Sequence, residues 1–457
     1  MRREIKWLPI ILLATSSLLL LPISFFPSDW AGWLLVYISF VLPLFFAPFR
    51  RDRKLLIILL LIVAAHNAVS IYNAYGGTVF GATLDAVKFQ DLAKDLATDK
   101  HPLWFTEFDS LEIGANAYTR FLASFYRVFG VSLLLGQSLS VIAYTLSCII
   151  LIYLAETFRF RFKRSLLVMY GLPAGSIIYC SIVMREAWQV LFFLLVIYLA
   201  IRLRSSPSIS TSILMLLSGL ALGLLHNGLF LYSLLLLGVS VYWGISGRWR
   251  KAGYKKVLIR ATILGVAFVG VMIWLYFGGE IGGATKAIRT GDVVVYTETY
   301  REKGEQDAAA NYQVKVDASS PLAFLTSGSI VFIYYQFAPF PWQVTRPLDA
   351  YATIEGVIRL MLIIYSFRLW WRARGERRQR YGYLIFCYFS LEFLWALGTG
   401  NWGTSVRHHI IAYGVLALLG GPGLMYSLNL LMHRLKFRRR RFSPLRRIEI
   451  KGIKAVG

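Results

Sequence analysis

The sequence has 457 residues, of which 57% are hydrophobic and only 16% are charged, with a formal net charge of +25. Soluble domains carry about a quarter charged residues. Apolar runs recur along this chain, and each is long enough to cross about 30 Å of hydrocarbon. The runs are continuous rather than alternating, which excludes a strand barrel. The composition therefore predicts an all-α fold, a polytopic transmembrane helical bundle in a lipid bilayer.

The positive charge is dispersed over many short loops rather than gathered in one domain. Basic residues of this kind are typical of the cytoplasmic loops of membrane proteins, so we do not expect a nucleic-acid partner. The three cysteines, Cys148, Cys180 and Cys387, all lie inside apolar runs. They are interpreted as small packing residues rather than as disulfide partners or metal ligands.

About twelve spans follow from the apolar runs when the basic loops are kept on one side. They are expected at roughly 7–27, 30–48, 55–73, 131–155, 165–182, 187–203, two within 211–245, 257–277, 352–369, 381–398 and 409–431. This arrangement places both termini in the cytoplasm and indicates an integral protein of the plasma (inner) membrane. In this arrangement Arg185 and Glu186 follow the 165–182 span on the outer side of the membrane.

The same pattern divides the chain into four parts. An N-terminal transmembrane module covers 1–279 and holds a first outer loop at 74–130. A second outer loop covers 280–351, C-terminal transmembrane helices cover 352–432, and a basic cytoplasmic tail covers 433–457. Within the second loop, 327–340 is apolar but short and ends at two prolines. It is interpreted as a re-entrant or interfacial helix, and the possibility that it spans stays open.

The first outer loop is rich in acids. Residues 83–97 have helical spacing, with an apolar face opposite Asp91 and Asp95, which predicts an amphipathic helix on the outer membrane surface. Asp85 lies in its first turn, where the helix dipole favours a carboxylate. Asp85 is either a first-turn acid paired with Lys88 or a functional carboxylate.

Further candidates lie at the predicted outer ends of other spans. Arg185 and Glu186 are either a snorkelling arginine and a first-turn acid or an anion site in which Glu186 orients Arg185. His226 interrupts a long apolar block and is either a turn residue or a substrate contact. Trp342 is either part of an interfacial aromatic belt or a platform for a sugar or lipid chain.

The stretch NWGTSVRHH, residues 401–409, begins the last predicted span. Arg407 is placed there against both the positive-inside tendency and the helix dipole, which favours a specific role such as holding a phosphate. His408 is expected to help Arg407, and Asn401, Asp91 and Glu186 are weaker substrate-binding candidates. Adjacent His408 and His409 diverge on a helix, so they do not suggest a zinc pair.

Three stretches resemble the GT-C superfamily of integral-membrane glycosyltransferases, which includes protein O-mannosyltransferases and lipid A aminoarabinose transferases. LDAVKFQDLA is similar to the acidic motif of the family's first outer loop. The segment from GANAYTRFLASFY to LAETF is similar to the helix entry that follows. IIYCSIVMREAWQVLFFLLVIYLAIR is similar to the next helical hairpin, and together the three cover roughly 80–205.

The resemblance implies transfer of a sugar from a polyprenyl-phosphate donor to a glycan, lipid or protein acceptor outside the cytoplasm. Asp85 would be the general base, and Arg185, Arg407 and His408 would stabilise the leaving phosphate. A divalent cation bridging Asp85 or Asp91 to a phosphate stays open, since no ligand spacing requires one. The expected setting is the assembly of a cell-surface glycan or glycolipid.

Two other functions stay open. A polymerase of lipid-linked polysaccharide repeat units also needs outer arginines and could dispense with Asp85. A transporter or flippase of lipid-linked sugars should place ionisable groups in mid-membrane. Glu392, within the span expected at 381–398, is the residue that favours the transporter.

Overall fold

The computed structural model describes residues 22–82, 85–99, 113–206, 208–246, 312, 314, 316–317 and 319–452. Most of the span expected at 7–27, the whole span expected at 257–277 and about half of the second outer loop, chiefly 280–311, lie outside the described residues. The side chains of 433–452, at the end of the last helix, are not described either.

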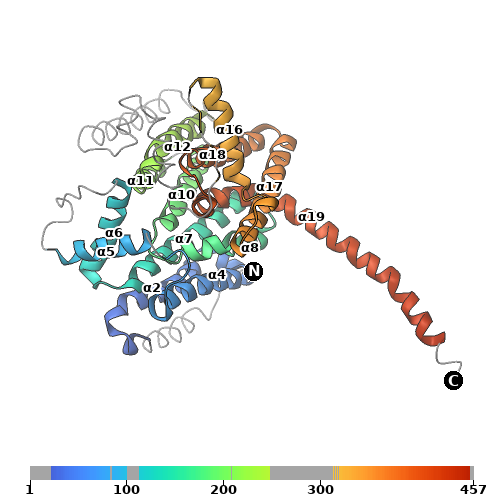
Figure 1. The fold of residues 1–457 in the computed structure, drawn as a ribbon, viewed down its shortest axis with the longest axis horizontal. Coiled ribbons are helices and arrows are strands. Elements are labelled where there is room, and N and C mark those ends of the chain that lie inside the picture. Colours follow the sequence, from blue (N-terminus) through green and yellow to red (C-terminus); the bar gives the residue numbers. More distant parts are fainter. Residues whose placement is uncertain are drawn as a thin grey trace.

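All elements of the described chain are helices, and they form one bundle (Figure 1). Their bounds are α2 Trp30–Val41, α3 Ala47–Arg51, α4 Arg53–Ile71, α5 Asp85–Thr98, α6 Ile113–Phe129, α7 Leu133–Thr157, α8 Lys163–Gly171, α9 Ala174–Tyr179, α10 Glu186–Ser205, α11 Ile209–Leu224, α12 Asn227–Ser246, α16 Pro321–Phe337, α17 Pro347–Arg372, α18 Gly375–Gly398 and α19 Trp402–Gly452.

Seven helical segments of the described chain are long and apolar enough to cross a membrane, so the chain is an integral membrane protein. They are Pro27–Phe45, Arg53–Gly76, Leu133–Thr157, Glu186–Ser205, Pro347–Arg372, Gly375–Gly398 and Trp402–Met432. Three shorter apolar helices, Ile209–Leu224, Gly228–Trp243 and Leu322–Phe337, lie beside them. The expected count of about twelve is not reached in the described residues.

The span predicted at 165–182 is wrong as a continuous helix. The structure has two short helices there, α8 and α9, separated at Leu172 and Pro173. Pro173 lacks a backbone N–H and has a ψ of 136°, which interrupts the helical hydrogen bonding. The Tyr351 hydroxyl accepts a hydrogen bond from the Ala174 N–H, so the exposed start of α9 is satisfied from α17.

The centre of the bundle is α10, which packs against α7, α11, α12 and α19. Its buried side chains point in all directions around the helix, as expected for a helix surrounded by others. Because α10 begins at Glu186, this central position carries Arg185 and Glu186 into the interior rather than to the lipid-facing surface.

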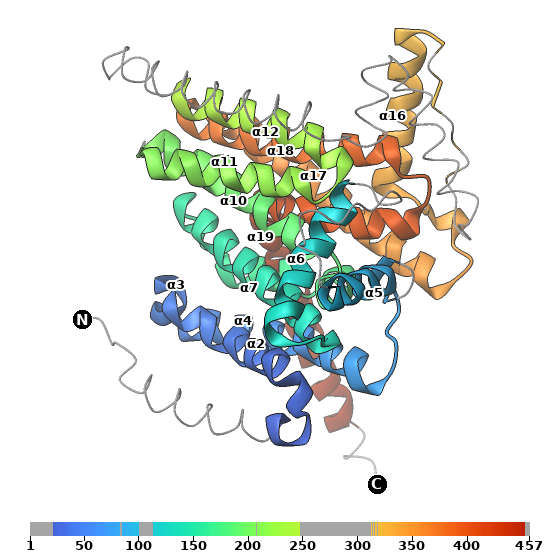
Figure 2. The same ribbon diagram turned by 90° about the vertical axis from the view of Figure 1, so that its left-hand side faces the viewer.

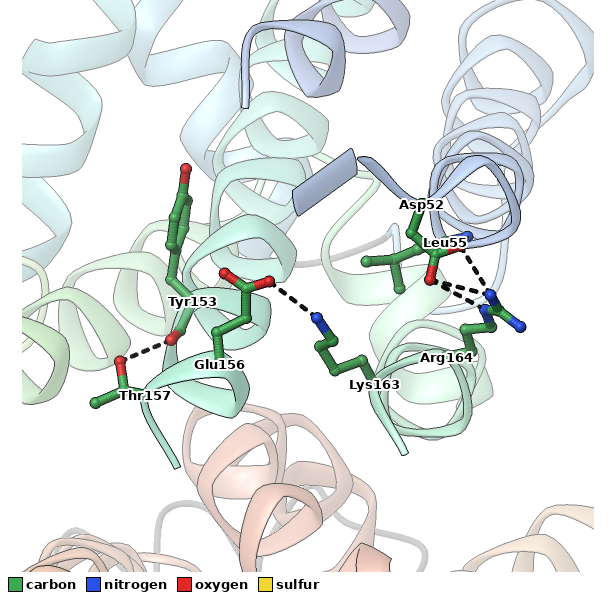
Figure 3. Close-up of polar contacts among 7 residues, drawn as sticks. All are labelled: Asp52, Leu55, Tyr153, Glu156, Thr157, Lys163 and Arg164. Carbon is green, nitrogen blue, oxygen red and sulfur yellow. Dashed lines mark hydrogen bonds and ion pairs between the residues drawn. The ribbon is translucent and has the colours of Figure 1, made fainter. Parts of the chain in front are cut away.

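The opposite end of α10 lies among the basic loops, where ion pairs join different helices. Asp52 caps α4 and pairs with Arg164 at 3.0 Å, while Lys163 pairs with Glu156 at 2.9 Å (Figure 3). In the same way Arg204 of α10 pairs with Glu376 of α18 at 2.6 Å. These contacts hold several basic loops together at one end of the bundle.

The amphipathic helix expected at 83–97 is present as α5, but its apolar face meets protein. Ala86, Phe89, Ala93 and Leu96 are buried in a cluster with side chains of α6, and α5 lies beside α6 in Figure 2. The expectation of a helix whose apolar face rests on the lipid is therefore wrong. The apolar partner is α6, a helix that was not expected from the sequence.

The helix expected at 327–340 is present as α16, which starts earlier and ends at Phe337. It packs against α17 and α18, with buried Val331 and Tyr335 facing them. It has 17 residues and is one of the three shorter apolar helices. The end of α19 extends away from the bundle (Figure 1).

Candidate functional site

Arg407 lies in the second turn of α19, and the start of that helix fixes its position. The Asn401 side-chain oxygen accepts a hydrogen bond from the Thr404 N–H at 2.8 Å, which caps the first turn. Asn401 is thus a capping residue in this structure. From this start, one face of α19 points toward α5 and α10 and carries Arg407 between them.

The Arg407 guanidinium joins two carboxylates from different parts of the chain. Its Nη1 donates to Asp85 Oδ2 at 2.9 Å, and its Nε lies 3.0 Å from Glu186 Oε1. The first contact is a hydrogen-bonded ion pair, whereas the Nε contact is a close ion pair without hydrogen-bond alignment. The Glu186 side chain is 2% exposed and that of Asp85 is 48% exposed. Arg407 therefore compensates the buried charge of Glu186 and also pairs with Asp85, which is more exposed to solvent.

Asp85 is ionised in this setting. Burial alone would raise its pKa, but the Arg407 guanidinium, helped by Arg185 and Lys88, outweighs burial and holds the pKa of Asp85 below its ordinary value. A carboxylate with a lowered pKa is a poor proton acceptor. Asp85 can become a better base only if Arg407 turns to another anion.

Arg185 brings a second guanidinium to the same place. It caps the start of α10, is 8% exposed, and its guanidinium carbon lies 5.5 Å from the centre of the Phe89 ring. Phe89 follows Asp85 by one turn of α5, so α5 contributes both a carboxylate and an aromatic face. We call Asp85, Arg185, Glu186 and Arg407 the charged cluster.

An aromatic wall adjoins the charged cluster. The Trp395 and His408 rings are stacked with their centroids 3.9 Å apart, and the Trp395 and His226 rings are T-shaped with their centroids 4.7 Å apart. The His226 Nδ1 accepts a hydrogen bond from the Gly228 N–H at 3.1 Å, so that nitrogen carries no proton. The His408 Nδ1 lies 3.0 Å from the Thr399 hydroxyl. Both histidines are therefore held in fixed orientations.

Two predicted site residues lie apart from this arrangement. Asp91 is exposed on the solvent side of α5. Trp342 is 80% exposed and stacks on Phe340 at 5.0 Å, in a short turn that packs on α17. Both positions follow from helical and turn geometry that residue type alone does not reveal.

Two residues of the site, Trp395 and Tyr179, are not among the residues expected from the sequence. Trp395 links the two histidines, and Tyr179 at the end of α9 lies where the charges of Arg407 and Glu186 act on its hydroxyl. Burial raises the pKa of Tyr179, so it keeps its proton and can donate. Tyr179 precedes Arg185 by only a short segment, a proximity that could have suggested it.

Two guanidiniums beside two carboxylates and an aromatic wall can bind an anion and hold a nearby base. Within the described ranges, no group of three or more His, Cys, Asp or Glu side chains is placed to hold a metal ion. Comparisons with protein-family models, with curated proteins and with solved structures give no match.

Proposed function

We propose that the chain is a membrane glycosyltransferase that moves a sugar from a polyprenyl-phosphate donor to an acceptor hydroxyl at the charged cluster. The observation that carries this proposal is Arg407 bridging Asp85 and Glu186 with Arg185 beside them. A phosphate needs the guanidiniums, an acceptor hydroxyl needs the carboxylate, and here the two kinds of group are already in contact.

In the proposed reaction the acceptor oxygen attacks the anomeric carbon as the bond from that carbon to the donor phosphate breaks. The hydroxyl proton passes to Asp85, and the negative charge that develops on the leaving polyprenyl phosphate is stabilised by Arg185 and Arg407. Glu186, buried and paired with Arg407, would hold that guanidinium in place. A single displacement inverts the anomeric configuration.

The Asp85–Arg407 pair suggests how the base would be activated. Binding of the donor phosphate would draw Arg407 away from Asp85, which removes the contact that lowers the Asp85 pKa. The carboxylate would then become a stronger base only when donor is present. In the absence of donor, Asp85 would stay paired with Arg407 and would remain a weak base.

The proposal is tested by Asp85→Asn, with Asp95→Asn as a matched control because Asp95 is exposed on the same helix. Membranes that contain each variant are supplied with a panel of labelled polyprenyl-phosphate hexoses, and new glycosidic product and released polyprenyl phosphate are measured. Loss of a general base should lower the rate about 100-fold or more, while Asp95→Asn keeps it. Retained transfer by Asp85→Asn at normal expression would rule out the base assignment.

A polymerase of lipid-linked repeat units is the second candidate. The low pKa of Asp85 favours it, because in that reaction Asp85 would serve only as a partner of Arg407. The same variants separate the two candidates. Polymer chain growth that survives Asp85→Asn but is lost in Arg185→Gln and Arg407→Gln would select the polymerase.

A further inference from the structure

A cavity of about 550 Å³ lies apart from the charged cluster, between α8, α9, α17 and α19. Its volume is in the range of small-molecule sites. The two sites share the start of α19: Arg407 faces the charged cluster, while its neighbours Val406 and His409 line the cavity.

The polar groups of the cavity lie along the first half of α17, as far as its midpoint at Arg359, and near the starts of α9 and α19. Glu355 and Arg359 are one helical turn apart on α17, which places their Cβ atoms about 6 Å from each other. Tyr351 donates to Glu355, and Arg359 donates one N–H to the Gln336 carbonyl oxygen. A guanidinium has five N–H donors, so Arg359 keeps others for a ligand. His409 is engaged by Glu392 and by the Tyr335 carbonyl oxygen.

The rest of the cavity is apolar and follows the helices. On α19 its wall runs from Val406 to Leu428, which at 1.5 Å per residue is about 33 Å, close to a full bilayer core. Leu172, Ile354 and Leu428 line it and are 47%, 59% and 42% exposed. Ile354 and Leu428 are on α17 and α19, which are long and apolar enough to cross a membrane. A hydrocarbon chain can therefore enter from the bilayer and lie along this wall.

We propose that this cavity binds a bilayer glycerophospholipid whose headgroup carries a phosphate and a primary ammonium, the phosphatidylethanolamine class. Charge complementarity selects this occupant. The phosphate pairs with Arg359, the ammonium pairs with Glu355, and the acyl chain fills the apolar length. A headgroup with phosphate alone would leave a carboxylate facing it. The proposal does not depend on the transfer reaction at the charged cluster.

The test uses the full chain in phosphatidylcholine vesicles with a trace of lipid that carries a diazirine in one acyl chain. The probe headgroup is phosphatidylethanolamine, phosphatidylglycerol or phosphatidylcholine, and labelled peptides are located by mass spectrometry. Met361→Trp fills the cavity, and Leu360→Trp is its matched control because Leu360 is equally exposed, 43% for each, but does not line the cavity.

We expect the phosphatidylethanolamine probe to label α17 and α19 about tenfold more than the phosphatidylglycerol and phosphatidylcholine probes do. A factor of about ten corresponds to the free energy of one hydrogen bond between charged groups, which the other two headgroups cannot make with Glu355. Glu355→Gln should remove the preference for the ethanolamine headgroup, and Arg359→Gln should lower labelling by every probe. Met361→Trp should abolish labelling by every probe, whereas Leu360→Trp should leave labelling unchanged.

Equal labelling by the three headgroups, or labelling unchanged by Met361→Trp, would overturn the proposal. Displacement of the probe by polyprenyl phosphate but not by unlabelled phosphatidylethanolamine would also overturn it and assign the cavity to the donor lipid. If Arg359→Gln does not fold, the headgroup comparison in the unchanged protein still decides.

Discussion

The roles of individual charged residues in this protein depend on the side chains that they contact. Arg407 was singled out because a cation at the start of a helix opposes the dipole, and the structure supplies the compensation in Glu186 and Asp85. Glu392 favoured a transporter when viewed as an isolated acid in a span. In the structure it is 0% exposed, and its Oε2 is bonded to His409 and Gln336, whereas its buried Oε1 has no hydrogen-bond partner among the described residues.

The Arg407–Glu186 pair should be strongly coupled. Arg407→Gln leaves the buried Glu186 charge uncompensated, so we expect it to lower the free energy of unfolding by about 3–5 kcal/mol. Glu186→Gln combined with Arg407→Gln should recover much of that loss. Chemical unfolding of the purified protein in detergent measures the double-mutant cycle. Strictly additive effects of the two substitutions would contradict the pairing.

At the scale of elements, close helix crossings decide which faces meet. α17 and α19 make the most extensive contact of the bundle and also form two walls of the cavity. They approach at Gly420, where an added Cβ would lie 2.2 Å from the Leu362 carbonyl oxygen. Backbone cannot move aside as a flexible side chain can, so the crossing depends on a missing side chain.

Gly420→Ala should therefore push α17 and α19 apart. Overpacking of this kind costs about 1–3 kcal/mol, which should lower the temperature at which the detergent-solubilised protein unfolds. The neighbouring Gly421→Ala is a matched control, because its Cβ would meet only Met169 at an ordinary 3.7 Å. Equal effects of the two substitutions would argue against the close crossing.

At the scale of the whole molecule, charge separates the two ends of the bundle. The pairs Asp52–Arg164 and Arg204–Glu376 lie at one end of the long helices, and the charged cluster lies at the opposite end of α10. If basic loops are cytoplasmic, the charged cluster faces the other side of the membrane.

This orientation can be measured with single cysteines in a chain whose three buried native cysteines have been replaced by alanine. Asp91→Cys, on the exposed side of α5, should react with an impermeant maleimide in intact cells. Arg161→Cys, between α7 and α8, should react only after permeabilisation. The reverse pattern would invert the topology and move the proposed reaction to the cytoplasmic face.

The sequence by itself determined the membrane class, the helical fold, most long spans and the candidates Asp85, Arg185, Glu186 and Arg407. Apolar length and charge placement are local properties, so they can be read along the chain. Tertiary structure decided which candidates meet: it joined Asp85 to Arg407, left Asp91 and Trp342 outside, and broke the helix at Pro173. It also revealed α6 and the cavity on α17. Such contacts join residues up to 322 positions apart, and their geometry depends on how helices cross, which local spacing does not encode.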